Sequence, residues 1–361
     1  MLVLTHRGWI MNESLQLLFD QGGSVLRYLV PAEFGFPQAA DLEQLRREML
    51  ASTEVQKWLG NLSASAQAGI RPNTIHGCAD TCYENAMGKL IQYGMRAGMP
   101  ELDARTEPFR RWLAEFPGGA KYLFGSFYST LVASMLAMAG YRDDAVIRVL
   151  HDRLEWTYDF CRQGRYDIYA DKAGFRGIPK VWTDVPLIDP SLYPEEELRL
   201  PLVHDFNGYA AVFAGLADGR IQEMLDTLAQ YVMDPRYQAL REGYGIVTNG
   251  KRRYWAMGWS VHLPGYPGAA PRPSYLGLIG RLATMSAFPV ARNHQWYSSS
   301  LEYLESFRTP HGTYLFPREL LPERKASPWV MGTHTGQGEN RRRASWQELE
   351  STYWMERLRR R

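Results

Sequence analysis

Two kinds of helical segment alternate along the chain, and they differ in where their hydrophobic residues fall. Residues 126–140, SFYSTLVASMLAMAG, are small and apolar on every side, which is typical of a helix surrounded by protein. Residues 143–160, DDAVIRVLHDRLEWTYDF, carry one apolar stripe with charges opposite it, so this helix is expected to bury a single face. Asp143 and Asp144 supply its N-cap and a first-turn acid. The pattern predicts an inner helix followed by an outer helix.

The same two patterns recur, and each inner segment ends in a short turn rich in Gly, Pro or Asp. The inner and outer segments pair as 74–90 with 107–116, 208–217 with 219–232, and 276–288 with 293–307. Helix pairs that repeat at irregular intervals predict an all-α fold, either an α/α array or a closed toroid. We expect a single α/α toroid domain over residues 1–361, with about five to six helix pairs between about residues 70 and 358.

Two long insertions interrupt the helix pairs, at about residues 162–204 and 234–273. Both are rich in Gly, Pro and aromatic residues. The second contains Asn249-Gly250 between β-prone residues, which predicts a small β-hairpin. In a ring of helix pairs, such insertions are expected at one rim, where they can roof a central cavity.

Composition narrows the class of protein. Hydrophobic residues make up 45% and charged residues 22%, which indicates a globular chain. Aromatic residues reach 13%, which is more than core filling needs and fits a cavity or a large wet surface. The net charge of +2 does not indicate the excess of basic residues that is typical of nucleic-acid-binding proteins. Three cysteines without framework spacing, and a start too short for a signal peptide, predict a cytoplasmic protein. No apolar run reaches the length of a membrane span. Peripheral contact with a membrane is compatible with this sequence.

In architecture, the chain resembles the terpenoid cyclase and protein prenyltransferase superfamily, such as the squalene and hopene cyclases. The resemblance lies in the turn AMAGYRDDAVIRVLHDRLEW, the loop YWAMGWSVHLPGY and the closing RRRASWQELESTYWMERL. It implies an α/α toroid with an apolar, isoprenoid-like substrate in a central cavity. The Asp-x-Asp-Asp acid motif of the class II cyclases is absent, because the single Asp-Asp pair, Asp143-Asp144, begins a solvent-facing helix. The zinc ligands of the prenyltransferases are not matched either.

The stretch TIHGCADTCYENAMGKL places His76, Asp80 and Glu84 four residues apart, beside Tyr83. If residues 74–90 are helical, the three ionisable side chains share one face, which an inner helix would turn to the cavity. An apolar pocket would raise the pKa of Asp80 or Glu84, so that either carboxyl could protonate an alkene or a glycosidic oxygen. Alternatively, His76 with two carboxylates could bind a divalent metal. The same residues could also serve only as a helix cap and as partners of backbone groups.

No residue is assigned as a metal ligand from the sequence. His76-x-Cys78 with Cys82 lacks the second ligand pair that a zinc site needs.

The stretch VHDFNGY groups His204, Asp205, Asn207 and Tyr209 at the start of another inner helix. These residues could lie at the same cavity mouth, where acids from two helix starts would supply paired carboxylates. They could instead form an N-cap cluster.

The loop RRYWAMGWSVHLPGY contributes Trp255, Trp259 and His262. Aromatic faces stabilise carbocations and stack on sugar rings, so the loop suits a terpene or a carbohydrate. It could equally be a packed lid without a ligand.

The stretch WVMGTHTGQGENRRR contains His334, Glu339 and Arg341. These residues could face the cavity, with the Arg holding a diphosphate. Alternatively, the segment closes the ring, and Glu339 and Asn340 cap the final helix.

We therefore predict an enzyme that acts on an apolar, isoprenoid-like small molecule, with Asp80, Glu84 or Asp205 as the proton donor and Trp255 and Trp259 as cation stabilisers. One alternative is a carbohydrate-active hydrolase or lyase, because α/α toroids also serve that chemistry. Another is a non-catalytic binding or scaffold protein. No residue pattern in the sequence requires a cofactor. If a cofactor binds, a divalent metal would suit the residues best.

Overall fold

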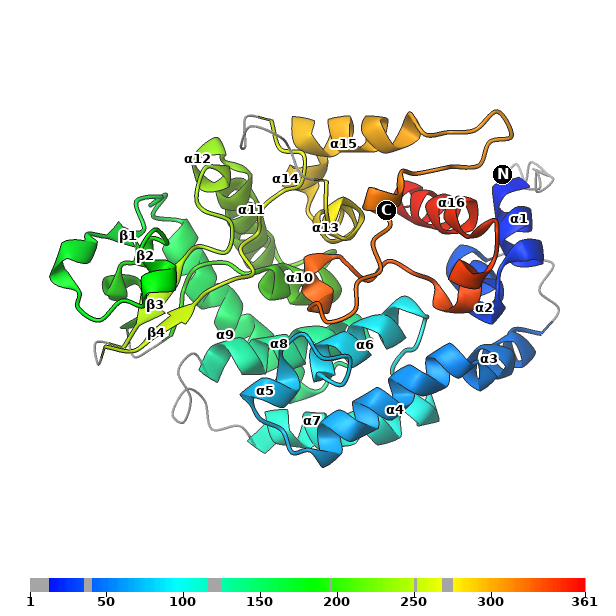
Figure 1. Ribbon diagram of the computed structural model, residues 1–361, viewed down its shortest axis with the longest axis horizontal. Coiled ribbons are helices and arrows are strands. Elements are labelled where there is room, and N and C mark those ends of the chain that lie inside the picture. The colour runs from blue at the N-terminus through cyan, green and yellow to red at the C-terminus, as the bar shows by residue number, and fades with distance from the viewer. Residues whose placement is uncertain are drawn as a thin grey trace, which may run out of the picture.

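The computed structural model describes residues 13–35, 41–115, 125–194, 197–249, 252–267 and 275–360. These residues are mainly helical, as the sequence predicts, with one small sheet (Figure 1). The helices are α1 Glu13–Gln21, α2 Ser24–Phe34, α3 Leu42–Ala51, α4 Thr53–Gln67, α5 Pro72–Ile75, α6 Tyr83–Gln92, α7 Pro100–Glu115, α8 Gly125–Met138, α9 Asp144–Cys161, α10 Val203–Val212, α11 Gly219–Met233, α12 Pro235–Gln238, α13 Leu278–Met285, α14 Pro289–Arg292, α15 Gln295–Glu305 and α16 Trp346–Arg359. None of these helices combines the length and the apolar character needed to cross a membrane.

The predicted difference between inner and outer helices is visible in α8 and α9. Helix α8 is buried along nearly its whole length, whereas α9 keeps one exposed side. Helix α8 contacts α6, α9 and α10, and it approaches α10 closely at Gly208, where a Cβ atom would lie 2.6 Å from Leu150 and Ser134. The Ser134 hydroxyl also donates to the His204 carbonyl oxygen over 2.7 Å.

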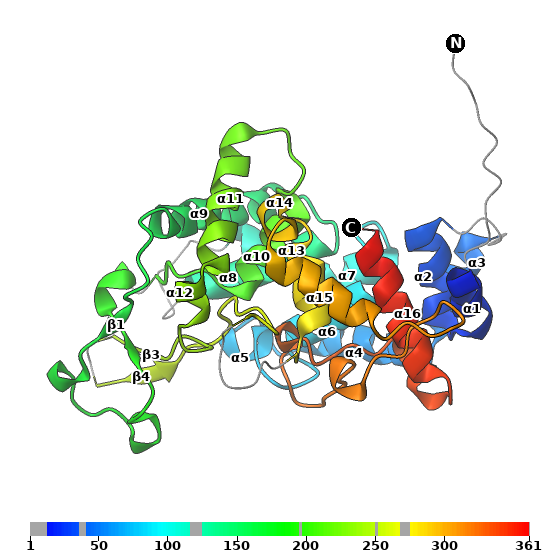
Figure 2. The ribbon, with the colours of Figure 1, turned by 90° about the horizontal axis from the view of Figure 1, so that it is seen from above.

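The apolar helices contact one another in sequence order. Helix α6 contacts α8, α8 contacts α10, α10 contacts α13, and α13 contacts α16. Helix α16 in turn contacts α1, so the two ends of the described chain lie side by side (Figures 1 and 2). Of the helices that follow them, α9 packs against α8 and α10, α7 packs against α8, α9 and α4, and α11 packs against α9.

Residues 74–90 do not form the single helix that the four-residue spacing predicts. Helix α5 ends at Ile75, and α6 begins at Tyr83. The Asn85 side chain holds the intervening turn by donating to the carbonyl oxygens of Gly77, over 3.0 Å, and Ala79, over 2.9 Å. His76, Asp80 and Glu84 therefore do not share one helical face.

The sheet is built from both insertions and lies at the opposite end of the molecule from α16 (Figure 2). Its strands are β1 Tyr169–Ala170, β2 Leu187–Ile188, β3 Ile246–Thr248 and β4 Tyr254–Ala256, in the order β1-β2-β3-β4. Strands β3 and β4 pair antiparallel, with Val247 opposite Trp255, which confirms the predicted hairpin. Gly250 of the predicted turn lies outside the described residues.

Candidate functional site

A cavity of about 1320 Å³ lies where the apolar helices meet the second insertion. Helices α10 and α13 form one part of its wall, and residues 255–266 and 329–335 form much of the rest. His76, Phe127, Trp255 and Trp259 contribute to the lining. Ligand sites are typically concave, largely apolar and furnished with a few polar groups, and this cavity has that character.

At the cavity wall, Glu84 brings two histidines together. Its Oε2 lies 2.5 Å from Nδ1 of His76, which follows α5, and its Oε1 lies 3.5 Å from Nε2 of His204 on α10. The Glu84 side chain is fully buried, and its Oε1 also accepts the backbone N–H of Val330 over 3.0 Å. The carboxylate thus ties three segments, α5–α6, α10 and residues 329–335, to one point.

Glu84 is ionised at neutral pH, which corrects the expectation of a protonated acid. Burial by itself raises the pKa of the Glu84 carboxyl, but the contacts and charges of His204 and His76 outweigh burial and lower the pKa from 4.5 to about 2. A carboxyl with that pKa holds no proton to donate to an alkene or a glycosidic oxygen near pH 7.

His76 is the member of this group that faces the cavity. Its side chain is 17% exposed, whereas those of Glu84 and His204 are fully buried. The His76 ring stands edge-to-face against Phe127 and Trp259, with centroids 5.4 Å and 4.7 Å away. Because Nδ1 is directed at Glu84, Nε2 is the ring nitrogen left to meet a bound molecule.

Trp259 is held next to His76 by an unusual backbone conformation. Its φ is 72°, in the left-handed region that bulky residues rarely adopt. The Trp259 carbonyl oxygen accepts the N–H of Val203, over 2.8 Å, at the start of α10. Residues held in such conformations against a strain of about 1–3 kcal/mol gather at functional sites.

His204 is buried beneath His76, and within the described part of the chain neither of its ring nitrogens has a hydrogen-bond partner. His76, Glu84 and His204 each offer one ligand atom, and these atoms lie within 4.8 Å of one another. Two imidazoles and a carboxylate form a donor set that suits divalent transition metals.

Asp80 does not lie in the cavity, contrary to the expectation for a candidate acid. Its carboxylate is 29% exposed and pairs with Lys57 of α4 over 3.1 Å. The turn at residues 76–82 directs Asp80 to the outside of the molecule, away from Glu84.

Asp205 is buried but belongs to a structural ion pair. Its Oδ1 and Oδ2 accept Nε and Nη2 of Arg153 over 3.0 Å and 2.9 Å, and Oδ2 also accepts the N–H of Leu202. The carboxylate caps α10 and neutralises a buried guanidinium, so Asp205 and Glu84 do not form a facing acid pair.

Tyr83 and Tyr209 also lie in the packed core rather than on the cavity wall. The Tyr83 hydroxyl donates to the Val132 carbonyl oxygen over 3.3 Å, and the Tyr209 hydroxyl lies 3.1 Å from that of Thr157. Both rings fill space between inner and outer helices.

Asn207 and His262, two of the predicted substrate-binding residues, line the cavity. Oδ1 of Asn207 accepts the Thr284 hydroxyl over 2.6 Å, which joins α10 to α13. Both nitrogens of His262 are engaged, one with the Ser260 hydroxyl at 2.7 Å and one with the Leu240 carbonyl oxygen at 2.9 Å. Burial lowers the pKa of His262, which keeps this ring neutral.

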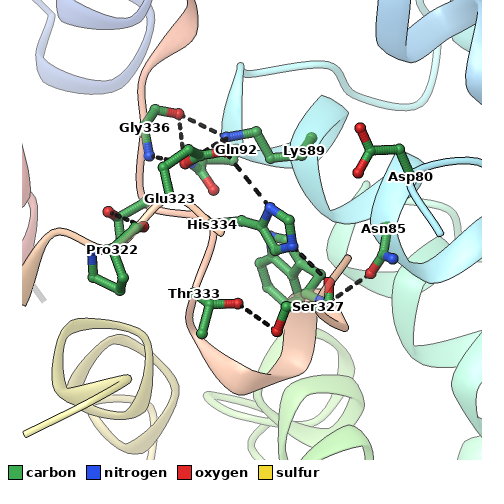
Figure 3. A network of polar contacts seen from close by, with 12 residues as sticks. Asp80, Asn85, Lys89, Gln92, Pro322, Glu323, Ser327, Thr333, His334 and Gly336 are labelled. Carbon is green, nitrogen blue, oxygen red and sulfur yellow. Dashed lines mark hydrogen bonds and ion pairs between the residues drawn. The ribbon is translucent and has the colours of Figure 1, made fainter. Parts of the chain in front are cut away.

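His334 lies on the cavity wall within a polar network that Figure 3 shows. Its Nε2 lies 2.7 Å from the Ser327 carbonyl oxygen, and its Nδ1 lies 3.6 Å from Oε1 of Glu323. Glu323 also accepts Nζ of the buried Lys89, over 3.2 Å. Nζ of Lys89 and Nε2 of Gln92 both donate over 2.8 Å to the carbonyl oxygen of Gly336.

Glu339 and Arg341 lie away from the cavity, and neither Glu339 nor Asn340 caps the final helix. Glu339 accepts the N–H of Ser24 over 2.9 Å, and Asn340 accepts that of Gly23 over 2.6 Å, so both cap α2. Arg341 pairs with Glu350 of α16 over 2.8 Å.

Arg281 on α13 is a cavity residue that the sequence reasoning missed. Its Nε and Nη1 are buried, and no described residue partners them. Burial lowers the pKa of its guanidinium to about 10, so it carries a positive charge at pH 7. The available signal was that Arg281 is the lone charged residue in the apolar stretch 276–288.

Comparison with known proteins adds no assignment to this geometry. No family model, no curated protein and no solved structure matches the chain.

Proposed function

We propose that the protein is an enzyme that transfers a proton to or from a small, largely apolar molecule bound in the cavity. His76 is the proton-transfer residue, and Glu84 positions it. The observation that carries this proposal is the pairing of a cavity-facing imidazole with a buried, ionised carboxylate over 2.5 Å. Such a carboxylate sets the tautomer of the ring and stabilises the imidazolium that forms when the ring takes up a proton.

The walls of the cavity support an apolar substrate. Phe127 and Trp259 flank His76 edge-on, and Trp255 lies on the same lining. Aromatic faces stabilise a positive charge that develops on carbon, so an isoprenoid-like molecule suits this environment. The order of contacts from α6 through α8, α10 and α13 to α16 supports an α/α toroid of the kind that terpenoid cyclases use.

The positions of the acids give glycoside hydrolysis no support. That chemistry needs two carboxyl groups facing one bond across about 5–10 Å. Asp80 pairs with Lys57 on the outside, and Asp205 is bound to Arg153. Of the three acids predicted from the sequence, Glu84 alone is next to the cavity, and there it is hydrogen-bonded to His76.

A second candidate function is a metal-dependent enzyme with His76, Glu84 and His204 as ligands. It is favoured by the buried His204, whose ring nitrogens form no hydrogen bond within the described part of the chain, while its Nε2 lies 3.5 Å from Oε1 of Glu84. A divalent ion at this point would give His204 a partner and would polarise a bound oxygen or nitrogen group. Metal analysis of the purified protein separates the candidates, because this one requires about one bound ion per chain that the substitution His204→Ala removes.

The test of the first candidate is turnover of a cell metabolite extract, followed by untargeted mass spectrometry. We expect the wild-type protein to consume at least one compound, and His76→Gln to slow that conversion at least about 100-fold. His311→Gln is the matched control, because His311 is exposed and does not line the cavity. Equal conversion by the wild type and His76→Gln contradicts the proposal, and absence of any conversion points to a binding or scaffold protein.

A further inference from the structure

Arg281 brings a positive charge to the wall of the cavity. It lies on α13, three residues before Thr284, so both share one face of the helix. Thr284 bonds to Asn207 of α10 over 2.6 Å, and all three residues line the cavity. The guanidinium is therefore turned to the same space as His76.

Arg153, the buried arginine of α9, is neutralised. Arg153 is paired on both sides by the carboxylate of Asp205, and it also donates to the carbonyl oxygens of Leu198 and Leu200. Arg281 differs, because its Nε and Nη1 are buried with no partner among the described residues. Burying a charge without a partner is strongly unfavourable, since water solvates the ion better than apolar side chains do.

The neighbouring cavity groups form no hydrogen bond to Nε or Nη1 of Arg281. Glu242 also lines the cavity, and its charge acts on Arg281 from a distance, but its side chain is exposed. The Asn207 oxygen is occupied by Thr284, and the Glu84 carboxylate by His76 and Val330. Arg281 is half-buried on the cavity wall, and the part of the chain that the structure describes gives its Nε and Nη1 no partner, so the guanidinium is left to something bound in the cavity.

We propose that Arg281 binds an oxyanion carried by the substrate, so that the substrate is an anionic amphiphile with an apolar body and a head group such as a carboxylate. The planar fork of a guanidinium matches two oxygens of one such group. The aromatic and aliphatic lining takes the apolar body. This inference rests on the proposed function, because it names the substrate class of the same cavity.

The experiment compares two fluorescent probes that differ in one anionic group. The anionic probe is 8-anilinonaphthalene-1-sulfonate, and the neutral probe is N-phenyl-1-naphthylamine, which lacks the sulfonate. We expect Arg281→Met to raise the Kd of the anionic probe at least tenfold, because two charge-assisted hydrogen bonds are lost, and to leave the Kd of the neutral probe within twofold. Arg281→Lys keeps the charge without the fork, so it should raise the Kd of the anionic probe by a smaller factor.

The controls separate this inference from the catalytic proposal. Arg148→Met removes an exposed arginine of α9 and should change neither Kd. His76→Gln is read out by turnover, and Arg281→Met by the difference between the two probes, so the two ideas fail in different assays. If Arg281→Met does not fold, as judged by near-UV circular dichroism, Arg281→Lys carries the test.

Three results overturn the inference. They are no saturable binding of the anionic probe by the wild type, an equal Kd for the wild type and the Arg281 variant, and an equal loss of affinity for both probes.

Discussion

The ion pair between Lys89 and Glu323 holds the segment that carries His334 against α6, and removing it should weaken the whole fold (Figure 3). The Lys89 side chain is only 1% exposed. In Glu323→Gln its buried ammonium keeps the hydrogen bond to the Gly336 carbonyl oxygen but faces the neutral amide of the new Gln side chain in place of a carboxylate. Breaking a buried pair in this way costs about 3–5 kcal/mol. Because the Glu323 side chain is 30% exposed, we expect about 2–3 kcal/mol at pH 7.

The pH dependence gives a second measure of the same interaction. Burial raises the pKa of Glu323, but the charge of Lys89, the nearby His334 ring and the hydrogen bond from the Gly336 N–H lower it from 4.5 to about 2. A folded-state pKa below the unfolded value means that this stabilisation is fully present above pH 4.5 and is lost as pH falls toward 2. The shift corresponds to about 3 kcal/mol, or about 2 after allowance for solvent screening.

The assay is urea unfolding followed by tryptophan fluorescence, at pH 7 and at pH 3. The difference in unfolding free energy between the wild type and Glu323→Gln should be about 2–3 kcal/mol at pH 7 and smaller at pH 3. Glu302→Gln, at an exposed position of α15, is the control and should stay within about 0.5 kcal/mol. The double variant Lys89→Met with Glu323→Gln should lose less stability than the sum of the single changes. Additive losses, or a difference that does not change with pH, would refute the reasoning.

Two further predictions concern packing around the site. Asp205→Asn should lower the unfolding free energy by about 3–5 kcal/mol, because it leaves the Arg153 guanidinium buried and unpaired, whereas Asp80→Asn should change it by less than about 1 kcal/mol. Gly208→Ala should cost about 1–3 kcal/mol, since its Cβ would lie 2.6 Å from two side chains, while Gly60→Ala in α4, with nothing within 4 Å, should be neutral or stabilising. Urea unfolding measures the unfolding free energy of all four variants. Equal changes in Asp205→Asn and Asp80→Asn, or in Gly208→Ala and Gly60→Ala, would contradict the explanation given for that comparison.

Local patterns predicted the elements whose determinants are local. The even apolar character of α8, the stripe of α9 and the β3–β4 hairpin all appear close to their expected positions. The stretch 74–90 misled the helical interpretation, because its polar residues recur every four positions by coincidence. A side chain outside that spacing, Asn85, holds the turn instead.

The site residues were partly predictable, but their partners were not. His76, Glu84 and His204 were candidates from their residue types, yet their meeting depends on the packing of α6 against α8 and of α8 against α10. Pairing of Asp205 with Arg153, 52 residues away, converts a candidate acid into a structural group, and no local pattern signals this. Long-range contacts of this kind are set by the tertiary fold, which sequence periodicity does not encode.

The unpartnered Arg281 was missed for a related reason. A single arginine in an apolar helix is expected to extend its side chain so that the guanidinium reaches solvent. Only the surrounding structure reveals that two of its nitrogens are buried without a partner.

The central claim is that the ionised Glu84 carboxylate directs His76 toward the cavity. Long-range ¹H–¹⁵N correlation spectra of histidine-labelled protein at pH 8 test it directly, with His76→Gln identifying the signals of that ring. We predict a proton on Nδ1 and a free Nε2 in the wild type, and a different tautomer balance in Glu84→Gln, because the carboxylate accepts the Nδ1 proton. A wild-type ring protonated on Nε2, with a spectrum that Glu84→Gln does not change, would contradict the account.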